Sequence, residues 1–166
     1  MKPIICLMTL VLTGLAPASV FAAPPVRAVD YRIMGEDERA ISMIEGALKT
    51  DSDGHKETVF YIGFSQPVGG PGGARVVSAT ILFDCATNRY KVGTSSSFAA
   101  DMTPIQKGTV QYGWRDVVPE SPFSRAWAYA CQGAALPRAT GVDVKAIMAG
   151  YLDRRAAATP EPAAAP

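Results

Sequence analysis

Few residues of this 166-residue sequence have the types and spacing needed for catalysis. The single histidine, His55, follows the turn 51–54, Asp-Ser-Asp-Gly. A Ser-His-Asp triad or a Cys-His pair would have to use this histidine, but the sequence contains no G-x-S-x-G motif. We therefore interpret His55 as part of a surface turn and expect no catalytic residues.

Clustered acidic residues are the other candidates for chemistry. The segment 51–54 partly matches a calcium loop, but the third ligand position and the closing bidentate glutamate are missing. The acidic residues at 36–38 are adjacent in sequence, which favours a solvated charged turn over a working pair of carboxylates. We expect no metal and no cofactor, and keep a hydrolase that uses Asp84 and Asp116 as the least favoured interpretation.

Residues 1–22 have the pattern of a cleavable secretory signal. Lys2 precedes an apolar run over residues 4–15, Pro17 ends it, and small residues lead to Ala22. A membrane-spanning helix needs about 20 apolar residues, more than this run supplies. No cysteine near Ala22 is available for lipidation. The sequence predicts an exported, non-lipidated protein, periplasmic or at the cell surface, with no transmembrane segment in the mature chain.

Cys85 and Cys131 are the two cysteines beyond this signal. An even number of cysteines in an exported protein indicates a disulfide. Neither a C-x-x-C spacing nor a flanking histidine favours a reactive or metal-binding pair. The chain-entropy model gives a loop of this length about 4 kcal/mol of stabilisation. We expect a structural Cys85–Cys131 disulfide.

The charge balance argues against several classes of partner. Lys and Arg number 16 and Asp and Glu number 15, and loss of Lys2 with the signal brings the mature chain close to neutrality. A nucleic-acid-binding protein needs a basic surface, and binding to anionic membranes needs a polybasic segment. We therefore expect no nucleic-acid partner.

The pattern of apolar residues predicts the strands that would position these groups. The clearest hairpin pairs residues 74–85 with residues 89–97. Further strands are expected at 31–34, 58–64 and 110–114. The segment 38–50 is ambiguous, because its spacing fits a helix while its length and Gly46 fit a strand followed by a helical turn.

Two helices are expected in the second half of the chain. Ser121 is a good N-cap and Pro122 a good first residue for a helix that ends near Cys131. On this helix Cys131 would face the strand that ends at Cys85. A second helix over about 142–155 has an apolar stripe at helical spacing: Val144, Ile147, Met148, Tyr151 and Leu152.

These elements predict one α+β domain over residues 23–155. It would contain a small antiparallel sheet packed with a helix, one disulfide and an additional C-terminal helix, followed by a disordered Ala/Pro-rich tail at 156–166. We place Phe83, Trp114 and Trp127 in its structural core. The last helix could pack on its own domain or on a neighbour.

The order of these motifs resembles the surface-adhesin protein E-like domains of Gram-negative bacteria. The resemblance lies in the strand-turn-strand at 83–90, Trp114, the stretch 118–121 and the helix that ends at Cys131, and it covers roughly residues 31–131. It implies a compact sheet with a packed helix and a role in adhesion to host proteins. The second helix and the glycine-rich segment 69–73 are not part of the family pattern.

Together these inferences predict an exported, non-enzymatic binding or envelope-associated module. Its partner, a host or envelope protein, would meet an exposed strand edge or a loop such as 69–73. The alternative is a periplasmic inhibitor or accessory protein of an envelope enzyme.

Overall fold

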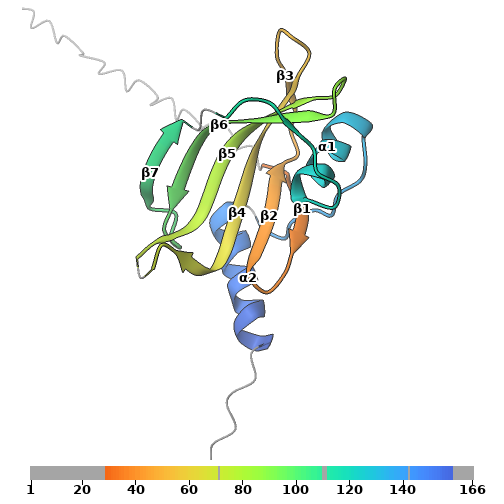
Figure 1. The fold of residues 1–166 in the computed structure, drawn as a ribbon. Coiled ribbons are helices and arrows are strands. Elements are labelled where there is room, and N and C mark those ends of the chain that lie inside the picture. The colour runs from red at the N-terminus through yellow and green to blue at the C-terminus, as the bar shows by residue number, and fades with distance from the viewer. Residues whose placement is uncertain (1–28, 71, 110–111, 142, 159–166) are drawn as a thin grey trace, which may run out of the picture.

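The computed structural model describes residues 29–70, 72–109, 112–141 and 143–158. The expected signal at 1–22 and the end of the expected tail, 159–166, lie outside these residues. The described residues form one antiparallel sheet of eight strands and two helices, and Figure 1 shows how these elements are arranged. The expected antiparallel sheet, two helices and disulfide are confirmed, and the sheet is larger than the small one expected.

The sheet follows the chain from one edge to the other. Six strands are hydrogen-bonded in this order: β1 (Tyr31–Glu36), β2 (Ala40–Glu45), β4 (Lys56–Val68), β5 (Ala74–Asp84), β6 (Arg89–Phe98) and β7 (Pro104–Thr109). The short strands β3 (Lys49–Thr50) and β8 (Arg115–Asp116) pair with β4 and β6. Most neighbours in the sheet are therefore neighbours in sequence, joined by short turns.

The ambiguous segment 38–50 forms strands β2 and β3 and no helix. Strand β2 lies between β1 and β4, and both of its faces are covered. Met43 belongs to the apolar core on one face and Ile44 to the core on the other, and both are fully buried. A strand buried on both faces has consecutive apolar residues, so its sequence lacks the alternation that identifies a half-buried strand.

The strand expected at 110–114 is not found where the structure describes that segment. Residues 112–114 form no strand, and residues 110 and 111 lie outside the described part of the chain. The chain instead pairs β7 with β6 before this point and β8 with β6 after it. Strand β7 is short and contains Pro104 and Gly108, which weaken its strand signal.

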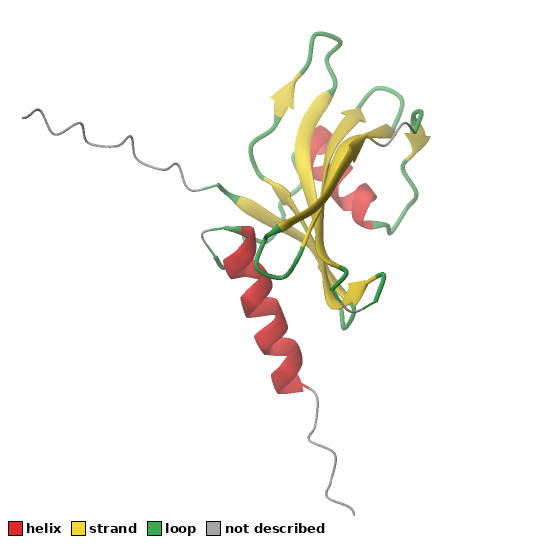
Figure 2. Cartoon of the chain, turned by 90° about the vertical axis from the view of Figure 1, so that its left-hand side faces the viewer, coloured by secondary structure: helices red, strands yellow, loops and turns green. Residues whose placement is uncertain are grey.

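The two helices cover opposite faces of the sheet, which Figure 2 shows nearly edge-on. Helix α1 (Pro122–Gln132) buries Ala126 and Ala130 against one face. Helix α2 (Val144–Ala158) buries Met148 and Tyr151 against the other. The apolar stripe predicted for the second helix thus packs on the helix's own sheet.

Helix α2 continues to Ala158, three residues into the segment 156–166 that the sequence predicted as tail. Its last residues extend beyond the sheet in Figure 2 and are exposed. Neither helix of the described chain combines the length and apolar character required to cross a membrane.

Candidate functional site

Helix α1 is capped at its start and joined to the sheet by a disulfide at its end. Ser121 Oγ accepts a hydrogen bond from the backbone N–H of Ser124 at 3.1 Å, and Pro122 is the first helical residue. In the last turn, Cys131 forms the disulfide with Cys85 at the end of β5, with the two Cα atoms 5.4 Å apart. The position of α1 determines which part of this face stays uncovered.

The uncovered part of the α1 face is hollowed from one side of the sheet to the other. Three adjoining hollows share lining residues, since Ile62 lines the first and second and Val77 and Ser95 line the second and third. Together they form a row across β2, β4, β5, β6 and β7. We call it the α1-side trough, and it has three parts of different chemistry.

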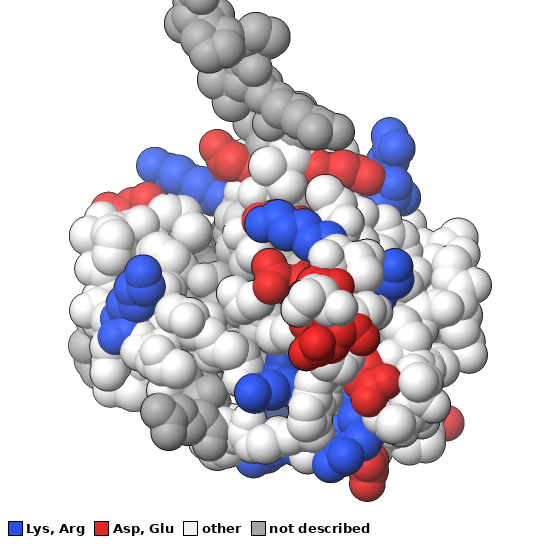
Figure 3. Space-filling view, turned by 90° about the horizontal axis from the view of Figure 1, so that it is seen from above, with Lys and Arg blue, Asp and Glu red and all other residues white. Residues whose placement is uncertain are grey.

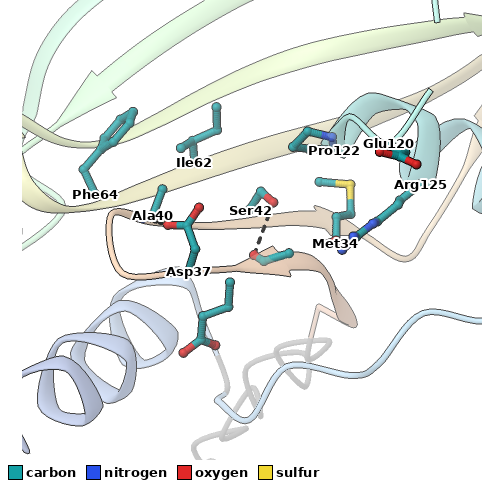
Figure 4. Close-up of a pocket in the computed structure, with 11 residues that line it drawn as sticks. Met34, Asp37, Ala40, Ser42, Ile62, Phe64, Glu120, Pro122 and Arg125 are labelled. Carbon is teal, nitrogen blue, oxygen red and sulfur yellow. Dashed lines mark hydrogen bonds between the residues drawn. The ribbon is translucent and has the colours of Figure 1, made fainter. Parts of the chain in front are cut away.

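The first part is a cleft of about 540 Å³ between the start of α1 and the β1–β2 turn. Figure 4 shows the side chains around it. The Ser42 hydroxyl donates to the Gly35 carbonyl oxygen at 3.3 Å, and Arg125 Nη1 donates to the Met34 carbonyl oxygen at 2.6 Å. These two bonds join α1 and β2 to β1, so they hold the walls of the cleft together.

Three carboxylates lie around this cleft. Asp37 Oδ1 accepts the backbone N–H groups of Ala40 and Arg39 at 2.8 and 2.7 Å, and these bonds lower the pKa of Asp37. Glu36 forms an ion pair of 2.9 Å with Arg154 of α2, and Glu120 is exposed. The charged groups at this end of the trough are thus mainly acidic, and they surround a lining that also includes Ile62 and Phe64.

The middle part is an apolar groove of about 230 Å³. Its wall includes Phe123, whose ring stacks on Phe60 at 4.9 Å and on Tyr90 at 4.4 Å between centroids. Tyr112 is 51% exposed, and the Arg115 guanidinium lies 4.2 Å from the centre of its ring. The groove is lined by Phe60, Ile62, Val77, Ala79, Ile81, Val92, Ser95, Tyr112 and Phe123.

The third part is a hollow of about 380 Å³ that leads to the outer strand β7. Hydroxyl and amide side chains dominate its lining. Its residues are Val77, Ser95, Ser96, Ser97, Gln106, Gly108 and Thr109. The trough therefore passes from an acidic cleft through an apolar groove to a hydroxyl-rich hollow.

The turn that holds the single histidine forms a separate cluster. His55 Nδ1 lies 2.9 Å from Asp51 Oδ2, while Asp51 Oδ1 accepts the backbone N–H groups of His55 and Asp53 at 2.8 and 2.9 Å. These interactions, with that to the His55 ring the largest, lower the pKa of the Asp51 carboxyl. Ligand atoms of the three residues lie within 4.8 Å of one another, but both Asp51 oxygens already support the turn.

This turn lies at the end of the molecule that Figure 3 shows from above, where acidic and basic side chains are mixed. Lys49 pairs with Glu57 at 3.9 Å, and Arg89 pairs with Asp116 at 3.6 Å. These pairs link β3 to β4 and β6 to β8. Each pair thus joins a short strand to the longer strand beside it.

The three aromatic residues predicted for the core have different environments. Phe83 is fully buried beneath α1. Trp127 is half-buried and packs against the same core, and its buried Nε1 has no hydrogen-bond partner among the described residues.

The prediction that Trp114 lies in the core is wrong, because Trp114 belongs to neither core cluster of the described chain. It lies half-exposed, with its ring centre 4.8 Å from that of His55. Its place just before the short strand β8 sets it against the β3–β4 turn instead of between sheet and helix.

The residues of the trough were not singled out as a site from the sequence. The alternation of residues 74–85 does place Val77 on the same face as Ile81 and Phe83. That pattern identifies a buried face, but it carries no signal for the part of the face that α1 leaves open.

A family model described as surface-adhesin protein E matches residues 36–132, more than half of the chain. The chain belongs to the surface-adhesin protein E family. The match runs from the end of β1 to the end of α1, and it includes the disulfide and almost all of the trough, while α2 lies beyond it. No curated protein and no solved structure matches the chain. This member is thus a surface-adhesin-like module.

Proposed function

We propose that this member of the surface-adhesin protein E family is an exported, non-enzymatic module that binds a protein partner through the α1-side trough. The observation that carries the proposal is the apolar groove in the middle of the trough. The exposed ring of Tyr112 and the side chains of Val77 and Val92 border water there, beside the core that α1 otherwise covers. A concave, mainly apolar surface with a few polar groups around it is the usual starting hypothesis for a binding site.

The surroundings of the groove support a protein as the partner. Protein interfaces combine an apolar, aromatic centre with a polar rim. The groove supplies the centre with Tyr112 and Phe123, and its two ends supply the rim. Glu36 and Asp37 lie at one end, and Ser97 lies at the other.

The use of the reactive side chains supports a non-enzymatic role. Cys85 and Cys131 are joined in the disulfide, so neither is a thiolate nucleophile. His55 and Asp51 bind each other and the backbone of their turn. Each of these groups therefore has a structural task.

Protease treatment of intact cells tests the proposed location. We expect the protein to be cleaved while a periplasmic control protein survives, because an adhesin must be reached from outside the cell. Protection together with recovery in the soluble periplasmic fraction would contradict a surface role. That result would favour the alternative, an inhibitor or accessory protein of an envelope enzyme.

A further inference from the structure

The two edges of the sheet differ in whether another segment of the chain hydrogen-bonds to the edge strand. At the β1 edge, the segment after α1 pairs with the strand: Ile33 N donates to Pro137 O at 2.8 Å, and Ala139 N donates to Tyr31 O at 2.9 Å. A bridge between Arg32 and Arg138 lies between these bonds. This edge is therefore covered.

The opposite edge is open along β7. Among the described residues β7 pairs only with β6, and all six residues of β7 are exposed. An antiparallel strand directs the backbone N–H and C=O groups of alternate residues to its two sides. The outward groups of β7 thus form a row of donors and acceptors without a strand partner in the described chain.

From this contrast we infer that β7 binds an extended segment of the partner polypeptide, which adds to the sheet as a further strand. The inference rests on the proposed function and names the form of the partner. A row of outward backbone groups at strand spacing is complemented by another extended backbone. An added strand also lies beside the hydroxyl-rich hollow of the trough, because Gln106 and Gly108 of β7 line it.

The side chains of β7 permit the approach of such a strand. Gly108 has no Cβ, and open space surrounds the position where one would stand. Lys107 is the single charged residue of the strand, so the edge imposes little charge selection on the incoming segment. Selectivity would come from the side chains that the segment places over the trough.

The same residues disfavour a second copy of this chain as the occupant. Lysine and proline on an edge strand oppose edge-to-edge association. Pro104 offers no backbone donor, and an antiparallel pairing of two β7 strands centred on Lys107 places two ammonium groups opposite each other. A foreign extended segment meets no such repulsion.

Peptide binding to the oxidised mature chain tests the inference. The probes are unstructured 12-residue peptides selected from a phage-displayed library on the purified chain, with affinities measured by fluorescence anisotropy. Amide hydrogen exchange followed by NMR reports which backbone groups become protected. We expect bound peptides to protect the outward amides of β7 at least tenfold.

Two pairs of variants separate backbone pairing from side-chain contact. Neighbouring residues of a strand direct their N–H groups to opposite sides. A proline at one of the two positions 107 and 108 therefore removes an outward donor, and a proline at the other removes a donor to β6. Of the amides of Lys107 and Gly108, the one that exchanges faster with solvent in the free chain is the outward donor. The outward proline variant should keep its melting temperature and lose at least tenfold in affinity, while Lys107→Ala and Gly108→Ala stay within about twofold.

Several results would overturn strand addition, and they are distinguishable from failure of the proposed function. In one such result, the peptides protect only trough residues, bind the outward proline variant, and no longer bind Tyr112→Ser. That result would refute the added strand and leave the proposed function standing. Concentration-dependent protection of β7 in the free chain assigns the edge to a second copy. A library that yields no binding peptide also refutes the inference, while the protease test still decides the proposed location.

Discussion

Gly63 of β4 and Met148 of α2 are in such close contact that no side chain fits at position 63. A Cβ there would overlap the Met148 sulfur and come within 3.1 Å of Ile41 Cγ2. Because Met148 is almost fully buried, its side chain has little room to move aside. This contact fixes the distance between α2 and the sheet.

Gly63→Ala is therefore expected to lower the free energy of unfolding by about 1–3 kcal/mol, the usual effect of overpacking. Urea unfolding followed by circular dichroism measures it. Gly93→Ala is the matched control, because a Cβ at Gly93 of β6 meets Thr80 at an ordinary 3.5 Å. Equal stability of the two variants would show that α2 does not press on β4 as described.

Tyr151 should be the main anchor of α2. Its side chain is fully buried, and its hydroxyl donates to the Asp37 carbonyl oxygen at 3.2 Å. Tyr151→Phe removes this bond alone and should destabilise by about 1 kcal/mol. Tyr151→Ala also removes the ring and should destabilise by about 3–5 kcal/mol, measured by urea unfolding. An alanine variant as stable as the phenylalanine variant would mean that α2 does not pack on its own sheet.

The sequence determined much of this fold, and its failures have identifiable causes. The alternation of 74–85 and the cap at Ser121 are local signals, and the structure has β5 and α1 there. Strand β2 was ambiguous because burial on both faces removes the alternation. Trp114 was assigned to the core on residue type alone, and its contact with His55 depends on how β8 meets the β3–β4 turn.

The trough could not be predicted for a related reason. Its residues are ordinary strand residues, and only the placement of α1 decides which of them stay uncovered. The disulfide and the N-cap of α1 are visible in the sequence, but the angle at which the helix crosses the sheet is a property of packing. The covered β1 edge likewise depends on a contact across about one hundred residues of chain, between Ile33 and Pro137.

Removal of the disulfide should destabilise the domain by about 4 kcal/mol, because the bond closes a loop with a sequence separation of 46. The double variant Cys85→Ser, Cys131→Ser tests this by urea unfolding without reductant. Adding dithiothreitol should bring the wild type to the stability of the variant and leave the variant unchanged. A wild type that resists reductant yet matches the variant would argue that the bond contributes no stability.

The Asp51–His55 turn should make stability depend on pH in a defined direction. Hydrogen bonds to the His55 ring and to backbone N–H groups lower the pKa of Asp51 below the ordinary 3.8. The stabilisation from this depressed pKa is present above the unfolded-state value and is lost as the pH falls through the lower folded-state value.

Asp51→Asn should therefore lower the melting temperature at neutral pH and have a smaller effect under acidic conditions, where the wild-type carboxyl becomes protonated. Asp53→Asn, in the same turn but with an exposed side chain, is the control. A difference between Asp51→Asn and wild type that stays constant from neutral to acidic pH would contradict the assigned role of the carboxylate.

The most direct test of the account is a comparison of two exposed apolar residues in partner binding. Tyr112 borders the apolar groove and is 51% exposed, while Val68, at the far end of β4, is 52% exposed and lines none of the three hollows. The purified oxidised chain and its Tyr112→Ser and Val68→Ser variants would be titrated onto immobilised extracellular-matrix proteins and cultured cell layers. We predict saturable binding by wild type and Val68→Ser, and at least a tenfold loss with Tyr112→Ser, because aromatic residues at the centre of an interface carry much of its energy. Absence of binding by the wild type, or equal binding by both variants, would contradict a protein-binding role for the α1-side trough.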